Sequence, residues 1–226
     1  MQLDGPRLEP RNGKAKSLVL LLHGVAAQGA NLLDLAHALQ TYLPDTLLLA
    51  PDAPFPYDDG PVGFQWFSLQ DRTPDVLLAG QREAAALLNG FADQLLSHLS
   101  LPPEGLAFVG FSQGAALALF AGLRHSPTIA GAVSFCGALP DTPALQDDIP
   151  SKPPLLLIEG EADEVVPFEA QARTGSWLEA AGLDVESVIR SGLGHAIDAD
   201  GIARAGAFLQ RVLANGKSVS IADAID

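Results

Sequence analysis

Short, continuously apolar runs alternate along the chain with longer segments whose apolar residues recur at helical spacing, and this alternation constrains the fold most. The runs lack a strict apolar–polar alternation, which is typical of parallel strands buried on both faces beneath helices. They predict the strands of one mostly parallel sheet. The predicted strands are Ser17–Leu22, Thr46–Ala50, Leu106–Phe111, Gly131–Phe135, Pro154–Ile158 and Val185–Ile189.

The segments between these runs predict helices. One apolar stripe consists of Leu77, Ala84, Leu88, Phe91, Leu95 and Leu99. The other predicted helices are Asn31–Tyr42, Gln113–Leu123, Phe168–Ala181 and Ile202–Leu213. Each joins two strands or closes the chain, so the pattern is repeated β–α with right-handed crossovers. The predicted fold class is α/β, with three layers and a doubly wound sheet of about six to seven strands whose sites lie at the carboxyl ends of the strands.

Length and charge limit the organisation and the partners. The 226 residues, 48% of them hydrophobic, predict a single domain over 1–226, with a core at about 17–214 and a C-terminal tail at 215–226. The chain has 13 basic and 27 acidic residues, a net charge of −14. Because this negative field repels nucleic acid and anionic membranes, neither partner is expected.

The N-terminal region and the cysteine content predict a cytoplasmic location. The first apolar run, Leu18–Leu22, is far shorter than the roughly 18–20 residues that span a bilayer, so no stable membrane association is expected. The chain also begins too polar for a signal peptide. Cys136 is the single cysteine, which excludes an internal disulfide and a cysteine-based metal cluster.

The segment Gly110-Phe111-Ser112-Gln113-Gly114 has the form G-x-S-x-G. The form alone is weak in a chain with 22 glycines, but here it follows a predicted strand and precedes an Ala/Leu-rich predicted helix, which is the setting of a nucleophile elbow. Both glycines fit, because positions two residues from a strained serine come too close for side chains. Ser112 is therefore the predicted nucleophile, and the N–H of Gln113, at a helix N-terminus, is a candidate oxyanion donor.

A serine hydroxyl needs a base to take its proton. His195, in Gly192-Leu193-Gly194-His195, directly follows the last predicted strand on a glycine-bearing loop and is the best candidate. The other histidines beyond the first strand are interpreted as structural. His37 and His98 fall within predicted helices, and His125 lies about 20 Å along the helix that starts after the elbow.

Asp163 is the predicted acid, because it lies in the loop that follows a buried strand. The order Ser112, Asp163, His195 is the order of α/β hydrolases. Glu161 and Glu164 flank Asp163 as alternative acids, and a simple turn or N-cap role for Asp163 stays open. The remaining candidates fit less well: Asp184 precedes its strand, and Asp141, Asp147 and Asp148 lie in a proline-rich loop.

Two further loops contribute to the predicted site. The first strand ends in His23-Gly24-Val25, where the N–H of Val25 is the candidate second oxyanion donor and His23 is interpreted as a support for the turn. Five of the chain's fourteen aromatic residues fall within thirteen positions of a Pro/Gly-rich loop: Phe55, Tyr57, Phe64, Trp66 and Phe67. Trp66, Phe67 and Phe64 either form a wall of an acyl pocket or hold the loop on the core, and both interpretations stay open.

Several segments, in order and spacing, closely resemble the phospholipase/carboxylesterase family, which includes acyl-protein thioesterases and bacterial carboxylesterases. They are LLLHGVAAQGANLLDLA, APFPYDDG followed by QWFSL, VGFSQGAALAL, CGALP, GEADEVVPF and GLGHAID. The resemblance runs from about Ser17 to the last helix. It implies an α/β-hydrolase fold with no large lid, no cofactor, and hydrolysis of short or medium acyl esters or thioesters. It supports the same triad and the same two oxyanion donors.

The chain departs from the family pattern near the predicted strand ends. Family members often carry Leu-Gly where Val25-Ala26 stands, histidine at Glu159, serine at Cys136 and aspartate at Ser68. The expected function is a serine carboxylesterase for small-molecule acyl esters. An acyl-thioesterase or lysophospholipase of the same fold, and a catalytically silent ligand-binding homologue, stay open. So does a homodimer, which is common in the family.

Overall fold

The computed structural model describes residues 3–215 and has a seven-stranded sheet at its centre, in the order β1-β3-β2-β6-β7-β8-β9. Six strands are parallel, and β1 pairs antiparallel with β3 at one edge. The strands are β1 (Arg7–Leu8), β2 (Ser17–Leu22), β3 (Thr46–Leu49), β6 (Leu106–Phe111), β7 (Gly131–Phe135), β8 (Leu155–Gly160) and β9 (Val185–Arg190). The predicted α/β class and sheet are confirmed.

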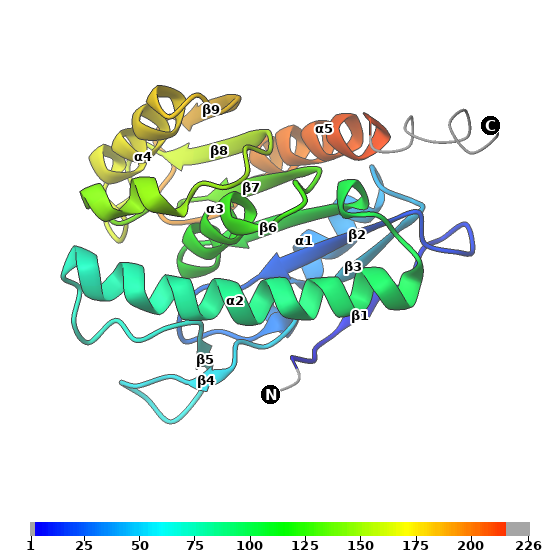
Figure 1. Ribbon diagram of the computed structural model, residues 1–226, viewed down its shortest axis with the longest axis horizontal. Coiled ribbons are helices and arrows are strands. Elements are labelled where there is room, and N and C mark those ends of the chain that lie inside the picture. Colours follow the sequence, from blue (N-terminus) through cyan, green and yellow to red (C-terminus); the bar gives the residue numbers. More distant parts are fainter. Residues whose placement is uncertain (1–2, 216–226) are drawn as a thin grey trace.

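Helices cover both faces of the sheet (Figure 1). On one face lie α2 (Pro74–Leu99), α3 (Gln113–Arg124) and α4 (Phe168–Ala180), and on the other lie α1 (Leu33–Gln40) and α5 (Ala199–Asn215). Short 3₁₀ helices add η1 (Gly29–Leu32), η2 (Pro103–Gly105) and η3 (Pro143–Asp148). The arrangement has the three predicted layers of an α/β-hydrolase fold.

The core explains why the central strands are continuously apolar. Successive side chains of a strand point to opposite faces, so Leu18, Leu20 and Leu22 of β2 pack toward α2 and α3, while Val19 and Leu21 pack toward α1 and α5. All six residues of β2 are buried. Because both faces are covered, the side chains of this strand are apolar except that of Ser17, whose buried hydroxyl is paired with the Thr46 hydroxyl at 2.7 Å.

The last strand differs from its prediction. β9 is an edge strand next to β8, and it is only partly buried, with Ile189 54% exposed. Burial on both faces was therefore wrong for this strand, because at the edge of the sheet the helices cover its faces only in part, with Val185 and Val188 alone packed against the core. The antiparallel β1 and the hairpin of β4 (Phe55–Pro56) and β5 (Phe64–Gln65) were not predicted, since two-residue strands leave no periodic signal.

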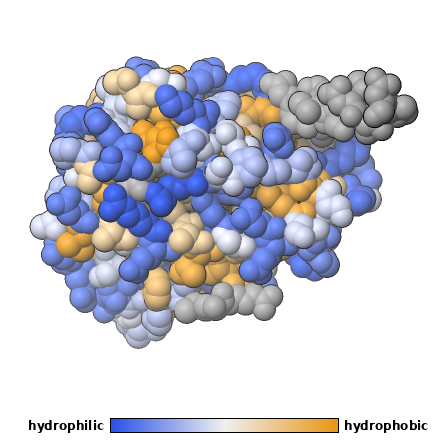
Figure 2. Space-filling view, viewed as in Figure 1, coloured by the Kyte–Doolittle hydropathy of each residue, from blue (hydrophilic) through white to orange (hydrophobic). Residues whose placement is uncertain are grey.

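The predicted C-terminal tail falls almost entirely on residues 216–226, which lie outside the described residues. On the face shown in Figure 2, hydrophobic residues form separate patches among hydrophilic ones. Within residues 3–215, none of the helices combines the length and apolar composition that a bilayer crossing requires.

Candidate active site

Ser112 occupies a sharp turn between the end of β6 and the start of α3. Its φ of 57° lies in the left-handed region, a strained conformation for a residue with a side chain. A Cβ on Gly110 would lie 2.1 Å from the Gly114 carbonyl oxygen, and a Cβ on Gly114 would lie 2.1 Å from that of Leu22. Both positions therefore require glycine, and the turn has the geometry that a nucleophile elbow needs.

Asp163 and His195 come together from the loops after β8 and β9, and His195 Nδ1 lies 2.7 Å from Asp163 Oδ2. The Asp163 side chain has no exposed surface. Its Oδ1 accepts hydrogen bonds from the N–H groups of Val165 and Val166, at 2.8 and 2.9 Å. Asp163 therefore orders its own turn as well as contacting the imidazole, so the catalytic and the turn interpretations describe the same side chain.

Two opposing influences act on the Asp163 carboxyl. Burial alone would raise its pKa, but the hydrogen bonds from His195 and from the backbone of Val166 and Val165 outweigh burial and lower the pKa below its usual value. The carboxylate is therefore ionised at neutral pH and fixes the proton of His195 on Nδ1. Among the alternative acids, Glu161 instead accepts a hydrogen bond from Ser191.

Gln171 is a partner of Asp163 that the sequence analysis missed. This fully buried residue of α4 donates from Nε2 to Asp163 Oδ2 at 3.2 Å and to the Val166 carbonyl at 2.7 Å. No motif marks a glutamine eight positions after the acid, because its proximity depends on how α4 packs on the loop.

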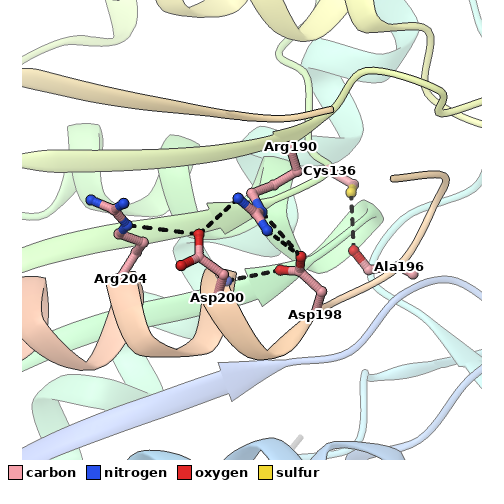
Figure 3. A network of polar contacts seen from close by, with 7 residues as sticks. Cys136, Arg190, Ala196, Asp198, Asp200 and Arg204 are labelled. Atoms are coloured by element: carbon pink, nitrogen blue, oxygen red, sulfur yellow. Dashed lines mark hydrogen bonds and ion pairs between the residues drawn. The ribbon is translucent and has the colours of Figure 1, made fainter. Parts of the chain in front are cut away.

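Ion pairs close the loop that carries His195, as Figure 3 shows. Arg190, at the end of β9, contacts Asp198 Oδ2 at 2.7 Å and Asp200 Oδ2 at 2.7 Å, just before and within the start of α5. The N–H of Gly201 donates to the other oxygen of Asp198 at 2.8 Å. The two ends of the loop are thus held together, which limits the positions open to the imidazole.

Cys136 touches the same loop from the end of β7. Its buried thiol donates to the Ala196 carbonyl oxygen at 3.6 Å (Figure 3), and burial with the nearby Asp163 charge raises its pKa to about 11. The ligand atoms of Cys136, Asp163 and His195 lie within 4.8 Å of one another. A metal ion there would have to displace the thiol proton and the Asp163–His195 hydrogen bond, so the arrangement favours that hydrogen bond over a metal site.

Ser112 lies between two cavities whose walls share Val25, Ser112 and Val165. We call the first, of about 370 Å³, the α2 cavity, because one face of α2 lines it. The second, of about 430 Å³, contains His195 in its wall and is called the His195 cavity. No hydrogen bond joins Ser112 to His195 within residues 3–215, a separation common in free hydrolases before substrate binds.

The two predicted oxyanion donors lie beside the elbow. Gln113 is the first residue of α3, and Val25 borders both cavities next to Ser112. Among the hydrogen bonds of the described residues, none is donated by the N–H of either residue. Two free N–H groups at this position can meet a negative oxygen.

His23 supports the turn before Val25, as predicted. Its Nδ1 bonds the Gly24 carbonyl at 2.7 Å, and its Nε2 accepts the N–H of Ala53 at 2.9 Å. Burial lowers its pKa, so the ring stays neutral and keeps this pair of bonds. His125, also interpreted as structural, is buried and contacts Asp93 at 3.1 Å.

The aromatic loop is fixed to the elbow by the side chain of Gln113, which accepts the N–H of Trp66 at 2.9 Å and donates to the Phe67 carbonyl at 2.8 Å. Of the predicted pocket residues, Phe67 lines the α2 cavity. Trp66 and Phe64 line neither cavity. Trp66 is 1% exposed and donates its Nε1–H to the His23 carbonyl at 2.9 Å. Of its two interpretations, the pocket wall is therefore wrong for Trp66, which holds the loop instead.

The three-layer fold, the strained serine at the carboxyl edge of its sheet and the carboxylate–imidazole pair together define an α/β-hydrolase. The model of the family described as Phospholipase/Carboxylesterase matches residues 3–213. The chain belongs to this family and is a hydrolase.

Individual relatives agree with this assignment. The esterase PE8, whose crystal structure is known, is 38% identical with a TM-score of 0.88, and the similarity covers 94% of this chain and all of that one. A probable carboxylesterase of Oryza sativa subsp. japonica is 33% identical over 66% of this chain and 58% of its own length. Acyl-protein thioesterase 1 homolog 1 of Dictyostelium discoideum is 25% identical over 78% of this chain and 82% of that protein.

Proposed function

We propose that this enzyme is a serine carboxylesterase that hydrolyses short to medium acyl esters, with Ser112 as nucleophile, His195 as base and Asp163 as the orienting acid. The observation that carries the proposal is the 2.7 Å contact of His195 Nδ1 with a buried carboxylate, in a ring that borders the same cavity as the strained Ser112. The contact with Asp163 lets the imidazole act as a base. A neutral imidazole that donates from Nδ1 has Nε2 free to accept the serine proton.

The reaction begins when Ser112 Oγ attacks the acyl carbonyl carbon and its proton passes to His195 Nε2. The tetrahedral intermediate collapses as the ester C–O bond breaks, and His195 returns the proton to the departing alcohol. Water then attacks the acyl-enzyme with His195 again as base, which releases the carboxylic acid and restores the serine hydroxyl. Asp163 stabilises the charged imidazole throughout.

The N–H groups of Val25 and Gln113 are proposed to bind the oxyanion of the intermediate. Such donors act in a site largely shielded from water, and each is worth about 3 kcal/mol of transition-state stabilisation. The side chain of Gln113 contributes indirectly, because it fixes the aromatic loop against the first turn of α3.

The two cavities are proposed to take the two parts of the ester. The departing alcohol must lie on the side of the imidazole that protonates it, which is the His195 cavity. The acyl chain then enters the α2 cavity, whose wall is largely apolar and includes Phe67, Leu69 and Leu77.

Replacing the nucleophile tests the proposal. We expect Ser112→Ala to abolish hydrolysis of nitrophenyl esters while circular dichroism and thermal unfolding stay close to wild type. A fluorophosphonate probe should label the wild type and not the variant. Turnover by the variant near the wild-type rate would refute the role of Ser112, whereas a folded wild type without labelling or turnover would support a silent binding homologue.

The ester preference is tested separately with nitrophenyl esters, acyl-thioesters and lysophospholipids of matched chain length. We expect the highest kcat/KM on acyl esters. A higher value on thioesters would move the assignment toward the activity in the name of the Dictyostelium relative.

A further inference from the structure

One face of α2 forms a wall of the α2 cavity. Pro74, Leu77 and Gln81 recur at spacings of three and four residues, so they lie along the same side of the helix. Leu69, Ala116 and Leu139 face them from other elements. Gln81 is therefore a carboxamide set among apolar side chains, two turns from the start of the helix.

Gln81 is buried and has no hydrogen-bond partner. It is 2% exposed, its Oε1 is sealed from solvent, and its side chain takes part in no hydrogen bond with another described residue. An unpaired carboxamide costs stability where leucine would cost none, and buried polar groups are normally paired. Because the amide nitrogen also has no partner among the described residues, a carboxamide in this cavity wall indicates a ligand that pairs with that nitrogen.

We infer that the α2 cavity is built for acyl chains that carry a hydrogen-bond acceptor, such as an oxo group, which accepts an N–H from Gln81. The surrounding protein seals the carboxamide oxygen, so the nitrogen is the atom left to meet a ligand. A nitrogen donor selects an oxygen acceptor on the chain. The apolar side chains around it bind the intervening methylene groups.

Charges at the rim of the cavity do not account for this selectivity. Arg72 and Arg173 also line the α2 cavity, but both are exposed. Arg173 lies 3.8 Å from Asp141, and Arg72 donates its Nε–H to the Leu69 carbonyl at 3.2 Å. Exposed charges of this kind discriminate weakly between ligands. The interior carboxamide is the group that distinguishes one acyl chain from another.

The inference rests on the proposed ester hydrolysis at Ser112 and adds the class of acyl chain. The test compares nitrophenyl esters of unsubstituted chains with oxo derivatives of the same chains, in which the ketone moves one carbon at a time. Each kcat/KM is divided by the rate constant for alkaline hydrolysis of the same ester, because a ketone close to the ester carbonyl activates it without any enzyme. We expect one isomer to exceed its parent in kcat/KM by about 3- to 10-fold, the effect of one hydrogen bond. If no isomer exceeds its parent while plain esters are hydrolysed, the inference fails and the proposed function stands.

Two variants locate the effect. Gln81→Met keeps the length of the side chain without the donor and should remove the preference. Asn89→Leu is the matched control, because Asn89 is another α2 carboxamide, bonded to the Ala121 carbonyl at 3.1 Å and absent from the cavity wall; it should keep the preference. Fluorophosphonate labelling checks that each variant is folded.

The wild-type comparison decides the question even if Gln81→Met does not fold. A preference that survives in folded Gln81→Met would overturn the inference.

Discussion

At the scale of single residues, Trp66 illustrates how an aromatic side chain in a binding loop can serve the loop itself. Its ring lies 5.4 Å from that of His23, centroid to centroid, and its indole N–H is bonded to the His23 carbonyl. Because His23 precedes the turn that presents Val25, Trp66 connects the aromatic loop to the proposed oxyanion site. The next residue, Phe67, lines the α2 cavity instead.

We predict that Trp66→Phe lowers the free energy of unfolding by about 1–3 kcal/mol, through the lost hydrogen bond and the space left in the core. Thermal unfolding measures this loss. The order of preference among nitrophenyl esters of increasing chain length should not change. Phe67→Leu is the matched control and should change that order; an altered order in Trp66→Phe would contradict the structural role.

Glu159 is a buried acid that the proposed mechanism does not use. It stands in β8 where the family often carries histidine, is 4% exposed, and its Oε1 has no partner among the described residues. A Cβ on Gly175 of α4 would lie 3.8 Å from this oxygen. Burial raises the pKa of Glu159 to about 7, from 4.5.

The raised pKa makes stability depend on pH. Between about 4.5 and 7 the native state holds a proton that the unfolded state has lost, so stability falls as pH rises through this window and levels off above it. We predict that Glu159→Gln removes this decline. The free energy of unfolding of the variant should then exceed that of the wild type by an amount that grows to at most about 3 kcal/mol at pH 8. Urea unfolding from pH 5 to 8 measures it. The exposed Glu179→Gln should keep the wild-type slope, and a parallel slope in Glu159→Gln would refute the assignment.

At the scale of elements, the loop between β9 and α5 shows how secondary structure limits the freedom of the base. Arg190 and Asp198 bracket His195 in the sequence, and their ion pair brings the end of the strand to the start of the helix. Opposite charges on either side of the loop were visible in the sequence. The sequence did not show that these charges pair, because their pairing depends on the direction in which α5 leaves the sheet.

We predict that Arg190→Met lowers kcat roughly tenfold with little change in KM, because a loosened loop misplaces the imidazole without altering the cavity for the acyl chain. Steady-state kinetics on one nitrophenyl ester measures both parameters. Arg211→Met is the matched control, since Arg211 pairs with Glu186 and also joins α5 to β9, but at the exposed surface and away from His195. Equal losses of kcat in the two variants would mean that docking of α5, and not the loop, controls the rate.

At the scale of the whole molecule, the sheet brings three distant loops to one edge. β6, β8 and β9 are parallel members of the same sheet, so the loops after them, which carry Ser112, Asp163 and His195, lie at the same end. The order of the strands was not readable from the sequence. The sequence did predict that the three loops share one edge, because parallel strands place all their carboxyl ends together.

The sequence by itself determined the class of fold, the central strands and the three residues proposed for catalysis. Local rules govern these features, since an apolar run marks a strand covered on both faces and the glycines at 110 and 114 mark a turn too tight for side chains. Tertiary structure alone decided that Trp66 supports the loop, that Gln171 holds Asp163, and that Gln81 is left without a partner. All three depend on how the helices pack on the sheet. The apolar stripe of a helix shows which of its faces is buried, but not which distant segment that face meets.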